Sequence, residues 1–267
     1  MERKVIMAVE GRRFTYSHRI VEGETPESFP SHIHDTCELL MLLQGNVNYT
    51  IEGRSYKLNR GDLVFTRPSV FHRIIPERNT TYERYNVIFD EKMLPEKIRQ
   101  RIPNIDIFPY ADNPRIMDLF EKIDEYGKNF EEEELKRLVS HLIEEIFYNM
   151  ALFDSIVSKR SNINPIVNSA LLYIRDNLCS VKNITEICDS LYITKSHLHH
   201  LFISSIGVTP KQYIISKRLL LAKKKINTGM KPTEASSSVG FDDYATFFRN
   251  YKKHFGYAPS AEAQPKS

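Results

Sequence analysis

The chain lacks several features that would assign it to a special class of protein. It has 267 residues, no tryptophan and only three cysteines, Cys37, Cys179 and Cys188. An odd number of cysteines without a spacing pattern does not make a disulfide framework, so we expect small buried thiols in a reducing compartment. No apolar run approaches the ~18 residues of a membrane-spanning helix, and the N-terminus lacks the apolar stretch of a secretory signal. We therefore expect a cytoplasmic protein with no membrane partner.

The charge is unevenly divided along the chain. The net charge is +3 and 41% of the residues are hydrophobic, which is sufficient for a packed core. Residues 1–160 hold 23 Lys and Arg against 27 Asp and Glu, a net of −4, whereas residues 161–267 hold 14 against 7, a net of +7. The basic second half indicates a polyanionic partner, although basic domains of other kinds are common.

Residues 1–90 are typical of a β-barrel or sandwich. Short apolar runs alternate with turn residues, and five of them are predicted strands: Leu39–Leu43, Asn46–Ile51, Arg54–Leu58, Leu63–Phe65 and Tyr85–Phe89. Residues 91–110 contain three prolines and are predicted to form a connection.

The apolar period then changes to that of a helix. Residues 112–153 are predicted to form a helical hairpin, with its turn at residues 127–129 and the acidic run Glu131–Glu134 at the start of the second helix. The following residues are polar, and we place a linker at 156–164. The predicted organisation is an α+β chain of two domains, residues 1–155 and 165–267.

The second domain is predicted to be all-helical, with two helix-turn-helix units. In the first, Asn183 and Glu186 form a capping pattern, and a turn at 192–194 leads to the helix Lys195–Ser205. A long helix then starts at Thr209 and Pro210 and runs to about Asn227. In the second unit, Thr233–Val239 and Asp243–Phe255 are the paired helices.

The long helix is predicted to space the two units on DNA. Its eighteen residues, from Pro210 to Asn227, span roughly 27 Å. Successive major-groove faces on one side of DNA are about 34 Å apart. A rod of this length could place one helix of each unit in adjacent grooves.

These motifs resemble those of the AraC/XylS family of transcription regulators. The segment Gly240–Pro259 is similar to the family signature, with Gly-Phe, then Phe-x-Arg-x-Tyr-Lys-Lys, then Gly-x-x-Pro. The segments Ile193–Phe202 and Gly207–Pro210, and Arg218 with Ala222 in the long helix, also resemble the family. The resemblance covers about 100 residues in several separate motifs. It implies sequence-specific binding of double-stranded DNA, regulation by a small-molecule effector, and RNA polymerase as a further candidate partner.

The resemblance also implies which side chains face DNA. The base-facing positions of the family fall on these residues: Ser196, His199, His200, Tyr244, Ala245, Thr246 and Arg249. Arg249 is suited to guanine, with a phosphate contact or an intrahelical pair as the alternative. Lys195, Lys252 and Lys253 are expected to contact phosphates.

One part of the second unit departs from the family. Pro232 and Ala235 stand where aliphatic residues are usual, and three consecutive serines, 236–238, are poor helix formers. We expect the second unit to be less tightly packed than the first.

The first domain resembles the cupin motif pair. His32, His34 and Glu38 have the spacing of the first motif, and His72 falls at the end of the second. If His32 and His34 lie on a strand they share a face, and with Glu38 and His72 from neighbouring strands they could hold a divalent transition metal. The alternative is that they line a pocket or brace loops, as in relatives that sense organic molecules.

Strand parity adds further pocket candidates. Arg84 and Asn86 share one face of a predicted strand, in the region of ligand contacts in sugar-sensing relatives, and Arg13 and Arg67 are weaker candidates. Such polar groups suit a small polar metabolite such as a sugar.

We therefore expect a non-enzymatic, ligand-controlled DNA-binding regulator without a cofactor. The competing hypothesis is a metal-dependent cupin enzyme with a DNA-binding tail. We also predict a homodimer formed through the hairpin, whose second helix carries an apolar stripe: Leu135, Leu138, Val139, Leu142, Ile146 and Met150.

Overall fold

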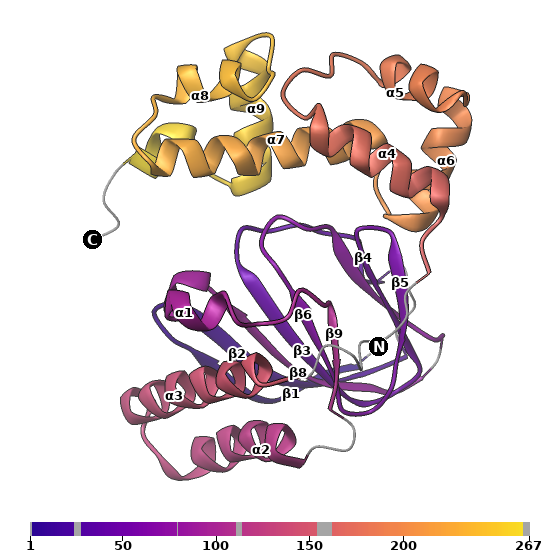
Figure 1. Cartoon of the computed structure of the whole chain (residues 1–267). Coiled ribbons are helices and arrows are strands. Elements are labelled where there is room, and N and C mark those ends of the chain that lie inside the picture. The colour runs from indigo at the N-terminus through magenta and orange to yellow at the C-terminus, as the bar shows by residue number, and fades with distance from the viewer. Residues whose placement is uncertain (1, 24–27, 79, 111–113, 154–161, 264–267) are drawn as a thin grey trace. The chain divides into compact units, whose positions relative to one another are not determined.

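The chain folds into two compact units, Met1–Asn162 and Ile163–Ser267. The computed structural model describes residues 2–23, 28–78, 80–110, 114–153 and 162–263 (Figure 1). Most of the predicted linker, residues 156–161, lies outside the described residues. Asn162 pairs with Ser55 in an isolated bridge, and Asn164 already caps the first helix of the second unit.

Nine described strands form two sheets in the first unit. The larger sheet has the order β1-β2-β8-β3-β6-β9 and the smaller has the order β5-β4-β7. Their bounds are β1 Glu2–Glu10, β2 Phe14–Glu22, β3 Cys37–Gln44, β4 Val47–Ile51, β5 Arg54–Leu58, β6 Asp62–Thr66, β7 His72–Pro76, β8 Tyr82–Phe89 and β9 Ile107–Pro109. Every pairing among these strands is antiparallel, and only β1–β2 and β4–β5 join strands that are consecutive in the chain.

The two sheets pack face to face around one core. Side chains from both are buried together between them, among them Leu40, Leu42 and Val64 from the larger sheet and Tyr49 and Ile74 from the smaller. Alternation along each strand sends every second side chain into this space. The predicted cupin-like β-domain is confirmed, and the five strands listed from the sequence are present with ends shifted by up to three residues.

The opposite face of the larger sheet is covered by the predicted helical hairpin. Helices α2, Pro114–Asn129, and α3, Glu132–Ala151, pack on this face over a second core (Figure 1). The predicted turn at residues 127–129 is wrong, because α2 continues to Asn129. A Cβ on Gly127 would lie 2.0 Å from Met7 Cε, so the glycine permits close packing on β1 and does not end the helix.

The stretch predicted as a plain connection contains structure of its own. Residues 91–110 hold the short helices Glu91–Met93 and α1, Glu96–Arg99, and the edge strand β9 pairs with β6. These elements are of three to four residues, too short for an apolar period to show.

A buried histidine joins the hairpin to the sheet. His18 on β2 lies with Nδ1 2.5 Å from Asp124 Oδ2 of α2 and Nε2 2.8 Å from Glu83 Oε1 of β8. Tyr16 donates a second hydrogen bond to Asp124, and the ring of Tyr85 packs on His18. Burial lowers the pKa of His18, but the hydrogen bonds to Asp124 and Glu83 outweigh it and raise that pKa above its ordinary value.

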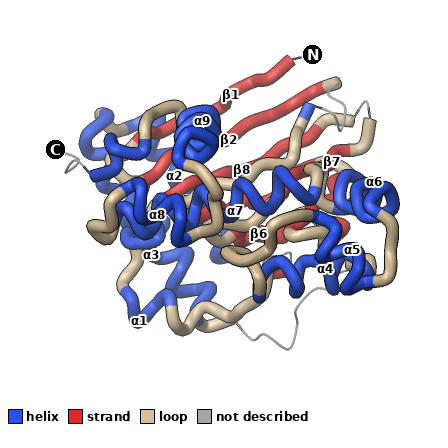
Figure 2. The backbone as a smooth tube through the Cα atoms, turned by 90° about the horizontal axis from the view of Figure 1, so that it is seen from above, coloured by secondary structure: helices blue, strands red, loops and turns tan. Residues whose placement is uncertain are grey.

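The second unit is built from six described α-helices. They are α4 Pro165–Asp176, α5 Ile184–Leu191, α6 Lys195–Ser205, α7 Pro210–Asn227, α8 Pro232–Ser238 and α9 Tyr244–Phe255. The predicted caps are confirmed at Asn183, Thr194 and Thr209, and the last forms a reciprocal capping box with Gln212. Figure 2 shows α7 between the α4–α6 group and the α8–α9 group.

The serines of α8 do not prevent its helix. Ser236 and Ser237 each donate a hydroxyl hydrogen bond to the carbonyl of Thr233, and Ser238 donates one to Ala235. Ala235 is fully buried in a core shared with α7 and α9. The small side chains therefore allow α8 to lie close to its neighbours.

Arg218 of α7 ties the two helix-turn-helix units together. Its guanidinium donates to the carbonyls of Leu178 and Val181, beside the first unit, and of Gly240 in the turn of the second. Gly240 has φ +93° and lies so close to Cys179 that a Cβ would be 2.3 Å from that residue's carbonyl oxygen. One buried side chain thus fixes the orientation of both units on α7.

We predict that histidine 18 makes stability depend on pH. A histidine with a raised folded pKa stabilises the fold below its unfolded pKa of about 6.5, and this contribution is lost as pH rises through the folded pKa. The melting temperature should therefore fall as the pH rises above about 6.5, and His18→Gln should flatten this fall. Circular dichroism melts measure it. The exposed His141→Gln is the control, and equal slopes for both variants would contradict the role of His18.

We also predict a large loss of stability in Arg218→Met. The variant leaves three carbonyls without their donor, which should cost about 3 kcal/mol of unfolding free energy in the second unit. Urea unfolding followed by circular dichroism measures it. Arg175, an exposed residue paired with Asp176, gives the matched control Arg175→Met, which should leave the unfolding free energy almost unchanged because exposed ion pairs contribute little. Equal losses in the two variants would show that Arg218 is dispensable.

Candidate functional site

A cavity of about 700 Å³ opens between the two sheets of the first unit. Its wall on the larger sheet comes from β1, β2, β3 and β8, and Tyr49 and Ile74 line it from the smaller sheet. Arg84 and Asn86, both predicted from strand parity, line this wall. His32 and Glu38 of the cupin-like motif line it as well, so the predicted pocket residues meet at one site.

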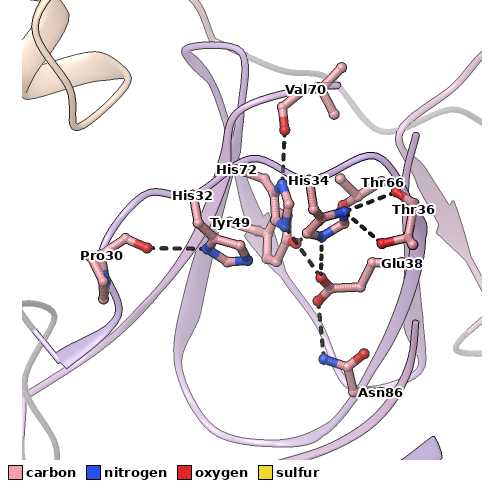
Figure 3. A network of polar contacts seen from close by, with 10 residues as sticks. All are labelled: Pro30, His32, His34, Thr36, Glu38, Tyr49, Thr66, Val70, His72 and Asn86. Atoms are coloured by element: carbon pink, nitrogen blue, oxygen red, sulfur yellow. Dashed lines mark hydrogen bonds and ion pairs between the residues drawn. The ribbon is translucent and has the colours of Figure 1, made fainter. Parts of the chain in front are cut away.

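The four cupin-motif residues converge at this cavity (Figure 3). One ligand atom from each of His32, His34, Glu38 and His72 lies within 4.8 Å of the others. The predicted positions of these residues on the strands are wrong in two respects. His32 and His34 lie in the segment before β3, where His32 makes an isolated bridge to His72, and they do not share a strand. Glu38 and His72 come from different sheets that face each other, and not from neighbouring strands.

Glu38 is the centre of the cluster. Its Oε2 lies 3.2 Å from Nε2 of His34 and 3.2 Å from Nε2 of His72, and its Oε1 accepts a hydrogen bond of 3.1 Å from Asn86. Burial alone would raise the pKa of Glu38, but the hydrogen bonds with the two histidines hold it well below its usual range. The carboxylate is therefore ionised although it is buried.

Backbone carbonyls face one nitrogen of each histidine. Nδ1 of His32, His34 and His72 lies 3.2, 2.9 and 3.0 Å from the carbonyl oxygens of Pro30, Thr36 and Val70, respectively. Nδ1 of His34 also lies 3.0 Å from the hydroxyl of Thr36, and Nε2 of His34 and of His72 is directed at Glu38. The arrangement is shown in Figure 3.

The donor atoms of the cluster suit a cation. Nε2 of His34 and Nε2 of His72 both lie 3.2 Å from Glu38 Oε2, and one ligand atom of His32 lies within 4.8 Å of them. Three imidazoles with one carboxylate suit a divalent transition metal, and Nδ1 bonds to carbonyls are the usual support of metal-bound histidines. Burial and the neighbouring His72 lower the pKa of His32, which keeps its ring neutral. The residues present therefore fit a metal ion.

Two of the predicted pocket residues do not line the cavity, and two arginines that line it were not predicted. Arg67 donates to the carbonyls of Pro103 and Ile105, Arg13 pairs with Asp90, and neither lines the described cavity. Arg3 and Arg19 do line it and were not predicted. The alternation of polar Thr15, Ser17 and Arg19 along β2 could have indicated Arg19.

The predicted DNA-contacting residues lie on the outer sides of α6 and α9. Leu198 and Phe202 of α6, and Phe247 and Tyr251 of α9, face inward and are fully buried. The predicted contacts are exposed, except for half-buried Thr246: Lys195, Ser196, His199, His200, Tyr244, Ala245, Arg249, Lys252 and Lys253. In the free protein Arg249 donates to Thr246 Oγ1 over 3.0 Å, which holds its guanidinium near the helix surface.

Comparison with known proteins identifies the family. Residues 15–151 match the AraC-like ligand-binding domain and residues 187–264 match a helix-turn-helix domain. The chain belongs to the AraC family of transcription regulators. It is thus a DNA-binding regulator with a ligand-binding domain, and its relatives are regulators and not enzymes.

Relatives of this AraC-family chain match most of its length. The lactose operon transcription activator of Staphylococcus xylosus is 23% identical over 227 residues, which are 83% of this chain and 81% of the relative. The activator RhaS of Escherichia fergusonii is 22% identical over 258 residues, 90% of this chain and 89% of the relative. The apo structure of a ToxT variant from Vibrio cholerae covers 96% of this chain and 98% of ToxT, with 12% identity and a TM-score of 0.42. Among the described residues, no helix is long and apolar enough to cross a membrane.

Proposed function

We propose that this regulator reads two adjacent major-groove faces of DNA with α6 and α9, under control of a small polar metabolite bound in the cavity. The observation that carries the DNA-binding part is the rigid connection of the two units. Helix α7 has 18 residues, or about 27 Å, and Arg218 bonds to backbone on both sides of it. This length is close to the ~34 Å between groove faces.

The exposed side chains of α6 and α9 fall into two groups, one proposed to contact bases and the other to contact phosphates. In this proposal Ser196, His199 and His200 of α6 reach base edges in one groove. Tyr244, Ala245, Thr246 and Arg249 of α9 do the same in the next, and Arg249 releases Thr246 to reach guanine. Lys195, Lys252 and Lys253 contact phosphates and set the register.

The cavity is the proposed effector site. Its lining combines Arg84, Asn86, Glu38 and His32 with apolar Leu40 and Ile88, which is the mixture expected for a small polar ligand. A sugar is one such ligand, and the name of the Staphylococcus xylosus relative, a lactose operon activator, supports this class.

A second proposal concerns the histidine cluster. We propose that His32, His34, Glu38 and His72 hold a divalent metal ion as part of the sensor. The convergence of imidazole nitrogens on a buried carboxylate favours it. A bound metal would supply a positive charge at the cavity wall and a contact for a ligand oxygen. The four residues are assigned to sensing and not to catalysis, because the relatives are regulators.

The proposed homodimer needs a different surface from the predicted one. Five of the six stripe residues of α3 are buried within the chain, against the sheet and α2: Leu135, Val139, Leu142, Ile146 and Met150. These five residues therefore do not form a free apolar face for a partner subunit. Tyr148 and Leu152, at the end of α3, are 48% and 75% exposed, and we propose them as dimer contacts. RNA polymerase remains a proposed partner at promoters.

The DNA proposal is tested by two substitutions in α9. Arg249→Ala should weaken binding to the cognate site by about 1–3 kcal/mol and relax selection at one or two base pairs. Lys252→Ala should weaken all sequences alike and reduce the salt dependence. Fluorescence anisotropy on DNA from upstream of the protein's own gene, with single base-pair variants, measures both. A uniform loss in Arg249→Ala would make it a phosphate contact.

The metal proposal is tested by elemental analysis. After exposure to zinc, manganese or iron and dialysis against metal-free buffer, the wild type should retain about one ion per chain. His34→Ala should retain far less, and His141→Ala, on the exposed side of α3, should match the wild type. A wild type without stoichiometric metal would overturn the proposal.

The dimer proposal is tested by light scattering at micromolar concentration. The wild type should show twice the chain mass, and Tyr148→Glu with Leu152→Glu should show the chain mass, because two charges would be buried in the interface. The exposed Glu145→Gln is the control. A monomeric wild type, or a dimeric double variant, would remove this surface from consideration.

A further inference from the structure

Two arginines face each other inside the cavity. Arg19 of β2 and Arg84 of β8 are direct partners in the antiparallel ladder, and both line the cavity. Directly opposed residues have Cβ atoms about 4.5–5.5 Å apart, and like charges at this position destabilise a sheet. Such a pair needs an explanation other than packing.

A third arginine lies on the same face. Arg3 of β1 is diagonal to Arg19, because Val5 pairs with Arg19 and Arg3 is two residues from Val5. Arg3 also lines the cavity. Three adjacent strands therefore contribute one guanidinium each to a single patch of the cavity wall.

The opposed pair has unused hydrogen-bond donors. The Nε atoms of Arg19 and Arg84 are buried and have no partner among the described residues. Arg84 uses Nη1 to donate a hydrogen bond of 2.6 Å to Tyr82, which is a neutral acceptor and leaves the charge uncompensated. Buried donors beside uncompensated charge are costly unless an anion accepts from them.

The carboxylates of the cavity lie at its other end. Glu10 pairs with Thr15, and Glu38 with Ile88, each four residues along its partner strand from Arg19 or Arg84. Four residues of strand span about 13 Å. Glu38 is moreover engaged by His34, His72 and Asn86. The cavity thus has a cationic end, at the arginines, and a hydrogen-bonding end, at Glu38 and Asn86.

We infer that the effector carries an anionic group, a carboxylate or a phosphate, which binds between Arg19 and Arg84 while its neutral polar part lies toward Asn86 and Glu38. This inference rests on the proposed effector site and narrows its ligand from polar metabolites to acidic ones, such as sugar phosphates or sugar acids. Guanidinium groups pair with both oxyanions through two parallel hydrogen bonds, which the Nε and Nη donors of each arginine can supply.

The first test titrates the full-length protein with inorganic phosphate and with acetate, by calorimetry at constant ionic strength. At least one anion should bind, and Arg19→Met should weaken it at least tenfold. Arg60→Met, in an exposed turn, removes the same charge and should bind like the wild type. Phosphate that is bound by α6 or α9, and not by the cavity, would bind equally well to Arg19→Met. Preference for phosphate or acetate distinguishes the two sources of the anion.

The second test needs no ligand. Removal of one charge of an opposed pair should raise the melting temperature of the ligand-free protein, so Arg19→Met should melt above the wild type at low salt, and the difference should shrink as salt screens the repulsion. Added phosphate or acetate should raise the melting temperature of the wild type more than that of the variant. A variant that melts lower than the wild type and responds equally to both anions overturns the inference.

A third comparison separates this inference from the proposed function. Glucose 6-phosphate, glucuronate and glucose are titrated against wild type and Arg19→Met, with DNA affinity measured alongside. Tighter binding of an acidic sugar than of glucose, lost in Arg19→Met, supports the inference. Glucose binding that is equal in both proteins and alters DNA affinity overturns the inference but keeps the sensor. Anion binding that leaves DNA affinity unchanged keeps the site and overturns its role as the effector site.

Discussion

A buried carboxylate must be paired or hydrogen-bonded, and the sensor unit is organised around this requirement at Glu38. The side chain is inside the protein, where an isolated ionised carboxylate would be prohibitively costly. His34 and His72 meet it from a loop and from the facing sheet, and Asn86 reaches it from the adjacent strand β8. The cluster therefore joins both sheets. The group that balances the charge of Glu38 also connects the two walls of the cavity.

The sequence predicted best those features that depend on neighbours along the chain. The helix Lys195–Ser205 and the strand Arg54–Leu58 agree with the structure to the residue, because caps and turn residues mark their ends. The spacing of His32, His34 and Glu38 indicated a shared site with His72, but not that the carboxylate and His72 come from opposite sheets. Which sheets face each other is a property of tertiary packing, and no local pattern encodes it.

Other features were missed or wrongly predicted because they depend on contacts between residues that are far apart in the chain. Gly127 has the signature of a turn but lies within α2, where the end of the Met7 side chain, 120 positions earlier, packs against it. The apolar stripe of α3 was predicted to form the dimer interface, whereas the sheet and α2 cover most of it. Arg19 and Arg84 are 65 positions apart and become a charge pair only through the register of β2 on β8. The contacts of Arg218 across the second unit are equally non-local.

Because side chains alternate along each strand, the larger sheet presents one set of residues to the cavity and another set to the hairpin. Arg19 faces the cavity and its neighbour His18 faces the hairpin; Arg84 faces the cavity and its neighbour Glu83 bonds to His18 on the reverse side. Arg19 is adjacent in the chain to His18, which bonds to α2. Arg84 is adjacent to Glu83, which bonds to His18. A ligand bound between Arg19 and Arg84 would therefore contact the residues that directly follow His18 and Glu83 in the chain, and these two residues belong to the buried network that joins the sheet to α2.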